Sequence, residues 1–442
     1  MTYDVVVIGS GLAGLVAAAS AAAGGAKVGV ISTSSGNLGL WSGLATGPAG
    51  GGRDVAEALC FFLETGERAG LPYRRAAALT GFDLLAASGR KVRAVLAPET
   101  MAAGDLRGLP TAACGSGLLV AGFTELADYP AALIAAEARA WTGLAVNHRS
   151  LSLGREVGHG SGPRIARLFD DRTWFQGFLD AARRVLIAEK PWRAGMDTAR
   201  PAAIAFPPVL GLFAFRDNLT ALSEALGCPV FELPALPPSI PGQRFWRFWR
   251  HRLEADGRVT FHAGRKVVKT GVEDGRCLWV ADELTRFQAR AFVLATGGVA
   301  GGGLLVSPSA FFAVTADDGE DGRQDQDRWS VDPAPDTPRE PLFDLDTAGQ
   351  GPDWLTWGPR TDRDGRPFQR AGAEGGSEAP RSSGAGRRRK PLANVFVAGW
   401  LLGGSEKRPP DACLSIVSGW RAGRLAASLA AKPDGERGGD PR

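Results

Sequence analysis

Residues 3–23 constrain the fold of this chain more than any other stretch. A β-branched run at residues 5–8 leads into the turn Gly9-Ser10-Gly11-Leu12-Ala13-Gly14, and an Ala-rich segment follows. A strand, the spacing G-x-G-x-x-G and a helix, in this order, are typical of a dinucleotide-binding βαβ unit. Free N–H groups at the start of such a helix, together with its dipole, favour a phosphate there. We therefore predict a nucleotide or flavin site at this turn.

The second strand of this unit, predicted over residues 25–31 and ending at Ser32, lacks an expected residue. Dinucleotide sites of this kind usually carry an acidic residue there, which binds the adenosine ribose. No Asp or Glu occurs between Asp4 and Asp54. The missing carboxylate makes an NAD-dependent dehydrogenase the least favoured class. It leaves FMN, which has no adenosine, open beside FAD.

Composition excludes several other classes. The 442 residues carry a net charge of +4, and the basic residues are mostly Arg, so a single Arg is weak evidence for phosphate binding. Five widely spaced cysteines without C-x-x-C, and four histidines without H-x-x-x-H, predict no iron–sulfur, zinc or other metal site. Free thiols indicate a reducing compartment. Since no signal peptide and no long apolar run appears, we expect a cytoplasmic protein without a transmembrane segment.

Three predicted strands end in glycine, and they lie far apart in the sequence. They are residues 5–9, 292–298 and 395–399. We expect one discontinuous α/β domain, Rossmann-like, in which these strand ends converge on one flavin. Between the first and second strands we expect an inserted, mainly helical domain. The predicted division is 1–142, 265–315 and 392–431 for the flavin-binding domain, 143–264 for the inserted substrate or partner domain, 316–391 for low-complexity insertions around a short apolar island, and 432–442 for a tail.

Several of these segments resemble the B subunit of anaerobic glycerol-3-phosphate dehydrogenase, within the fumarate-reductase and succinate-dehydrogenase flavoprotein group. The similar segments are residues 4–15, the loop ending Ser42-Gly43, the L-P-P-S-x-P-G run at 236–242, residues 292–298 with the glycines at 301–303, and residues 394–404. The sequence departs from the family in the charged, Gly-rich stretch 317–390. It also departs at 407–415, where the turn around Cys413 is poorer in glycine.

The resemblance implies a flavoprotein subunit that oxidises glycerol 3-phosphate to dihydroxyacetone phosphate and passes electrons to the quinone pool. It implies FMN as cofactor, with FAD as the alternative. It also implies two partners, a second flavoprotein subunit and a membrane-bound iron–sulfur subunit, and through them a peripheral location at the inner face of the membrane. The residues expected to bind the cofactor are Gly9, Ser10, Gly11, Leu12, Ala13, Gly14, Ser32, Ser42, Gly43, Thr296, Gly297, Gly298, Gly399, Gly403 and Gly404.

Two residues are candidates for the oxidation of the substrate itself. Oxidation of a secondary alcohol needs a base near the carbinol and a cation for the phosphate. His159, in a Gly-rich loop, and nearby Arg164 are the candidates, although a plain surface loop fits the same pattern. Two alternatives to a dehydrogenase subunit stay open. One is an electron-relay or scaffold subunit that binds flavin without oxidising substrate, and the other is a stand-alone fumarate-reductase-like oxidoreductase.

Overall fold

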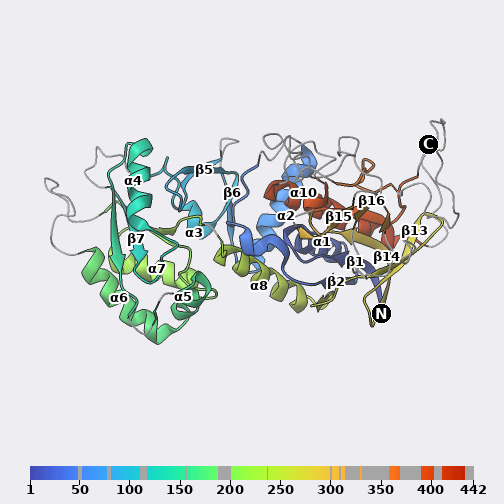
Figure 1. Cartoon of the computed structure of the whole chain (residues 1–442), viewed down its shortest axis with the longest axis horizontal. Helices are drawn as coiled ribbons and strands as arrows, with labels where there is room; N and C mark the ends of the chain where they lie inside the picture. The colour runs from blue at the N-terminus through green and yellow to red at the C-terminus, as the bar shows by residue number, and fades with distance from the viewer. Residues whose placement is uncertain are drawn as a thin grey trace. The chain divides into compact units, whose positions relative to one another are not determined.

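The computed structural model describes residues 1–47, 52–76, 81–109, 117–154, 157–158, 160–187, 201–235, 237–298, 301–307, 310–313, 329–330, 358–368, 390–402 and 411–433. The chain divides into two compact units (Figure 1). Unit 1 contains Met1–Asn37, Gly50–Thr65 and Trp249–Arg442, and unit 2 contains Leu38–Ala49 and Gly66–Phe248. Three elements cross the borders: η1 (Gly36–Leu40), α2 (Arg53–Arg68) and α8 (Ile240–Ala255).

Unit 1 is built on a seven-stranded sheet with parallel strands at its centre. Its path is β11-β2-β1-β14-β13-β12, and β18 also pairs with β14. The strands are β1 (Thr2–Ile8), β2 (Val28–Ser32), β11 (Val259–Ala263), β12 (Lys269–Glu273), β13 (Arg276–Ala281), β14 (Arg286–Leu294) and β18 (Val395–Val397). The pairs β11–β2, β2–β1, β1–β14 and β14–β18 are parallel. β13 pairs antiparallel with both β14 and β12. Continuous apolar runs at residues 5–8 of β1 and 291–294 of β14 fit such buried parallel strands.

Two helices of unit 1 pack closely because their facing residues are small. α1 (Leu12–Ala23) follows β1, and α10 (Ala412–Ala431) follows β18. A Cβ on Gly423 would lie 2.2 Å from the carbonyl oxygen of Ala17, and one on Gly419 would lie 2.5 Å from that of Ala13. Only glycine lets the backbones approach so closely. This contact fixes the N-terminal end of α1 against the C-terminal part of the chain. The other described elements of unit 1 are β15 (Leu304–Ser307), β16 (Ala310–Ala313), β17 (Trp329–Ser330) and η6 (Gly399–Leu402).

Unit 2 has a parallel sheet of its own, in the order β10-β9-β7-β8. The strands are β7 (Leu118–Phe123), β8 (Val146–Leu151), β9 (Ala203–Phe206) and β10 (Val230–Glu232). Helices connect them: α4 (Ala131–Thr142), α5 (Gly162–Phe169), α6 (Arg172–Leu186) and α7 (Phe215–Leu226). Unit 2 also contains a hairpin of β4 (Phe82–Leu85) and β5 (Lys91–Ala94), an antiparallel pair of β3 (Tyr73–Arg75) with β6 (Leu96–Pro98), and the short α3 (Glu99–Ala102).

The fold class expected from the sequence is confirmed, because β1, α1 and β2 form the βαβ unit and β14 and β18 join the same sheet. The borders of the two compact units differ from the borders expected at residues 142 and 264. β7 pairs with β8 and β9, so residues 118–123 belong to the sheet of the inserted unit. That unit is therefore a parallel α/β sheet with helices. The predicted insertions at 316–391 lie largely outside the described residues.

Candidate functional site

The backbone at the carboxyl ends of β1, β14 and β18 in unit 1 forms a hollow that we call the cradle. The glycine turn after β1 is its first wall. Gly9 has a φ of +106°, and a Cβ there would lie 2.2 Å from the carbonyl oxygen of Ala295. A Cβ on Gly14 would lie 2.0 Å from the carbonyl oxygen of Gly9. A Cβ on Gly11, in contrast, would meet nothing within 4 Å. Gly9 and Gly14 are thus required by close packing, whereas Gly11 faces open space at the start of α1.

The start of α1 is suited to an anion. Gly11 is the N-cap residue, and no side chain caps the helix. The first N–H groups of a helix have no partner within the helix, and the dipole favours negative charge there. Open space in front of Gly11 leaves these groups accessible. A phosphate of a nucleotide or flavin therefore fits the geometry of this turn.

The end of β14 forms the second wall. The N–H of Ala295 donates to Ile8 at 2.8 Å, which continues the pairing of β1 with β14 past the strand. A Cβ on Gly303 would lie 1.8 Å from the carbonyl oxygen of Gly297, so the chain folds back on itself at this point. The hydroxyl of Thr296 donates to the carbonyl of Gly303 at 3.4 Å. These contacts hold residues 296–303, as far as they are described, in a tight backbone turn.

The end of β18 forms the third wall. The N–H of Ala398 donates to Leu294 at 2.9 Å, and Gly399 follows with a φ of +73°. A Cβ on Gly399 would lie 2.7 Å from the Cβ of Ala13 in α1. Since β1, β14 and β18 are parallel neighbours, their carboxyl ends lie at one edge of the sheet. This edge is where open α/β sheets bind ligands.

The predicted cofactor residues fall into three groups. Gly9, Ser10, Gly11, Leu12, Ala13, Gly14, Ser32, Thr296, Gly297, Gly298 and Gly399 all lie in unit 1, at or beside the carboxyl ends of its strands. Ser42 and Gly43 lie in unit 2. Gly403 and Gly404 lie outside the described residues. Of the first group, Ser32 ends β2 with its side chain buried, and the hydroxyl of Ser10 donates to Ser34 at 2.8 Å.

Within unit 2, the run at 237–242 holds the loop that contains Ser42 and Gly43. The N–H of Ser239 donates to Gly39 at 2.8 Å, and the hydroxyl of Ser239 donates to Trp41. A Cβ on Gly242 would lie 1.7 Å from the carbonyl oxygen of Leu38. The L-P-P-S-x-P-G pattern is therefore explained, over its described residues, by docking of this loop onto the start of α8.

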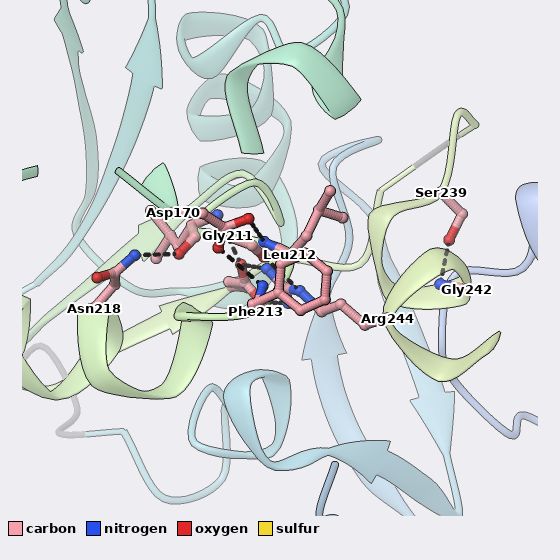
Figure 2. Close-up of polar contacts among 10 residues, drawn as sticks. Asp170, Gly211, Leu212, Phe213, Asn218, Ser239, Gly242 and Arg244 are labelled. Carbon is pink, nitrogen blue, oxygen red and sulfur yellow. Dashed lines mark hydrogen bonds and ion pairs between the residues drawn. The ribbon is translucent and has the colours of Figure 1, made fainter. Parts of the chain in front are cut away.

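A buried ion pair lies at the carboxyl end of β10 in unit 2. The guanidinium of Arg244 donates to both carboxylate oxygens of Glu232, at 2.6 and 2.8 Å, and its Nε donates to Gly211 at 2.8 Å. Next to it, Asp170 accepts hydrogen bonds from three consecutive backbone N–H groups, and Asn218 donates to Leu210 (Figure 2). The negative charge of Glu232 also acts on Tyr129: burial raises the pKa of the Tyr129 hydroxyl, and repulsion from Glu232 raises it by a smaller amount. Sequence reasoning missed this network because its members are far apart in the chain.

The candidate residues for the chemistry are not among the residues described for unit 1. Arg164 lies on α5 of unit 2, and His159 lies outside the described residues. His262, in β11, shares a 2.8 Å hydrogen bond with the hydroxyl of Tyr3, and burial, with Arg265 nearby, lowers its pKa. The described residues contain no cluster of His, Cys, Asp or Glu that could hold a metal ion. Within the same residues, no helix is both long and apolar enough to cross a bilayer.

Fold and site together define an α/β protein of the dinucleotide-binding type. Similarity to known proteins is more specific. A Halobacterium salinarum protein, named as the probable B subunit of anaerobic glycerol-3-phosphate dehydrogenase, is 28% identical over 462 aligned positions, covering 96% of this chain and 97% of that protein. A Pectobacterium carotovorum protein, named as the B subunit of the same enzyme, is 28% identical, covering 60% of this chain and 68% of that one. The resemblance expected from the motifs is confirmed.

No protein-family profile matches the chain. Among solved structures, a point mutant of the E. coli quinol fumarate reductase FrdA aligns with a TM-score of 0.38 and 11% identity, covering 98% of this chain and 71% of that one. A 3-ketosteroid-Δ4-(5α)-dehydrogenase from Rhodococcus jostii RHA1 aligns with a TM-score of 0.34 and 13% identity, covering 98% and 97%. Overall superpositions this loose add nothing to the topology described above.

Proposed function

We propose that this chain is the flavin-binding B subunit of an anaerobic-type glycerol-3-phosphate dehydrogenase. The observation that carries the proposal is the glycine cradle at the carboxyl ends of β1, β14 and β18, in a chain that aligns nearly end to end with a relative of that name. The proposed partners are a second flavoprotein subunit and a membrane-bound iron–sulfur subunit, and electrons would pass to quinone. We expect a cytoplasmic protein, held at the inner face of the membrane through a partner.

Different segments of the cradle would bind different parts of a flavin. The N–H groups at the start of α1, reached through the open space before Gly11, would bind the phosphate. Backbone groups around Gly297 and Gly399 would line the remainder. A bound flavin supplies an acceptor for the hydride that leaves C2 of glycerol 3-phosphate as the alcohol becomes a ketone. We propose FMN over FAD, because no acidic residue follows β2 to bind an adenosine ribose.

Oxidation of the substrate also requires transfer of a proton. The hydroxyl proton of the substrate must pass to a base, and His159 is the proposed base, with Arg164 as the proposed phosphate ligand. The described segments of the cradle, at 9–14, 34–37, 296–298, 301–303 and 399–402, contain no acid, base or cation. This absence favours the second candidate function, a relay subunit that holds flavin while a partner oxidises the substrate.

The test begins with the purified full chain. Its chromophore is released and identified by absorbance and mass, and glycerol 3-phosphate is then added to the holoprotein without oxygen. FMN that bleaches with this substrate would support the dehydrogenase. Flavin that bleaches only with dithionite would favour the relay subunit, and a chain that takes up no flavin would refute both.

A matched pair of variants links the flavin to the cradle. Gly11→Ala and Gly177→Ala each add a methyl group where no atom lies within 4 Å, so neither should disturb packing. Only the methyl group of Gly11→Ala enters the space assigned to the phosphate. We expect this variant to lose flavin affinity by at least about tenfold, equivalent to about 1.4 kcal/mol. Gly177→Ala, on α6 of unit 2, should bind flavin like the wild type.

A further inference from the structure

The loop after β2 lies against the glycine turn. Gly36, with a φ of +60°, is so near that a Cβ there would lie 3.5 Å from the Cα of Gly11. Two hydrogen bonds fix the loop: the hydroxyl of Ser10 donates to Ser34 at 2.8 Å, and the N–H of Gly36 donates to the hydroxyl of Ser34 at 3.2 Å. The residue after Gly36 is therefore held beside the open space at the start of α1.

That residue is Asn37, which is half-buried. Its amide nitrogen lies 3.9 Å from the point that a Cβ on Gly301 would occupy. It thus stands between two walls of the cradle, the turn at Gly11 and the turn that follows β14. Within the described part of the chain, the amide makes no hydrogen bond. An amide that can both donate and accept is thus left free where the other described cradle segments offer mostly backbone.

We propose that Asn37 contacts the cofactor, and that its amide forms a hydrogen bond with a polar group of the flavin. This inference rests on the proposed function. The chemistry fits because the described cradle has no cation, so a phosphate and the hydroxyl groups of a flavin chain must be bound by neutral donors. Asn37 is the side chain of η1 that can supply such a donor, since the other residues of η1 are Gly36, Leu38, Gly39 and Leu40.

Flavin titration of the full chain tests the inference. The bound flavin is removed, and the Kd for FMN is measured by fluorescence quenching for the wild type, Asn37→Ala and Asn37→Asp. Loss of one hydrogen bond should raise the Kd about three- to tenfold in Asn37→Ala. Asn37→Asp should raise it more, because a carboxylate beside an anionic phosphate adds repulsion without a compensating cation. Asn147→Ala and Asn147→Asp, at a half-buried site on β8 of unit 2, are the controls and should leave the Kd unchanged.

Each outcome decides the question. Unchanged affinity in both Asn37 variants, with normal binding by the wild type, would overturn this inference and leave the proposed function intact. Absence of flavin binding by the wild type would overturn both. Thermal unfolding of each cofactor-free variant is recorded as well, and should Asn37→Asp fail to fold, the affinity of Asn37→Ala alone decides between the two results.

Discussion

The buried ion pair of unit 2 allows a sharp test of its energetics by the change Arg244→Met. The side chains of Arg244 and Glu232 are 2% and 0% exposed, and the guanidinium makes three hydrogen bonds. Methionine would fill much of the apolar volume beside Phe215, whose ring centre lies 4.4 Å from the Arg244 Cζ. It would leave Glu232 with the backbone N–H of Leu210, 3.2 Å away, as its described donor.

The expected cost is large because a buried charge would lose its countercharge. Removing one partner of a buried pair typically costs about 3–5 kcal/mol, whereas removing both charges is often tolerated. We expect Arg244→Met to lose stability in that range. Adding Glu232→Gln, which keeps an acceptor for Leu210 while removing the charge, should recover at least about 2 kcal/mol, because the unpaired charge is the main penalty.

Urea unfolding followed by tryptophan fluorescence gives the free energies for the wild type, both single variants and the double variant. Hydrogen exchange over residues 203–232, read by mass spectrometry, reports on unit 2 itself and should accelerate in Arg244→Met. A loss below about 1 kcal/mol would refute the reasoning, since that is the scale of an exposed ion pair. So would a double variant no more stable than Arg244→Met.

Three further predictions concern packing, a loop and pH. Gly423→Ala should lower the stability of unit 1 by about 1–3 kcal/mol in thermal unfolding, because its Cβ would collide with the carbonyl oxygen of Ala17 in α1. A normal melting temperature would contradict that packing. Asp170→Ala leaves three backbone N–H groups at 212–214 without their carboxylate, so amide exchange there should accelerate; unchanged exchange would show that the carboxylate does not fix the loop. The pKa of His262 is lowered in the folded state, chiefly by burial. Its contribution to the free energy of unfolding should therefore be fully present above the unfolded pKa of about 6.5 and decrease as the pH falls below that value. His262→Gln should flatten this part of the pH–stability profile, and an unaltered profile would exclude His262 as its source.

Local patterns account for the predictions that the structure confirms. The strand predicted at residues 395–399 is β18, and the predicted strand that begins at residue 292 is the end of β14. The βαβ unit at the start of the chain is also as predicted. Each of these elements is specified by a short apolar run and by the glycines that end it, so nearby residues suffice to identify it.

Predictions that required distant contacts were less successful. Nearby residues do not specify the pairing of β7 with β8 and β9, because it places Leu118 beside Ala203, far along the chain. For the same reason the expected borders at 142 and 264 differ from those of the compact units. The role of Ser42 and Gly43 in binding a cofactor stays a prediction, and what the structure adds is that Ser239 and Gly242 hold their loop within unit 2.

The sequence by itself determined the class of fold and the glycine turn after the first strand, because strand, turn and helix are adjacent and glycine's freedom of φ is a property of the residue. Only the tertiary structure shows which atoms make Gly9 necessary for packing while Gly11 faces open space. Their difference comes from Ala295, nearly three hundred residues away, whose carbonyl oxygen approaches Gly9 while Gly11 is left clear. The same long-range folding brings Asn37 beside Gly301 and buries Arg244 against Glu232.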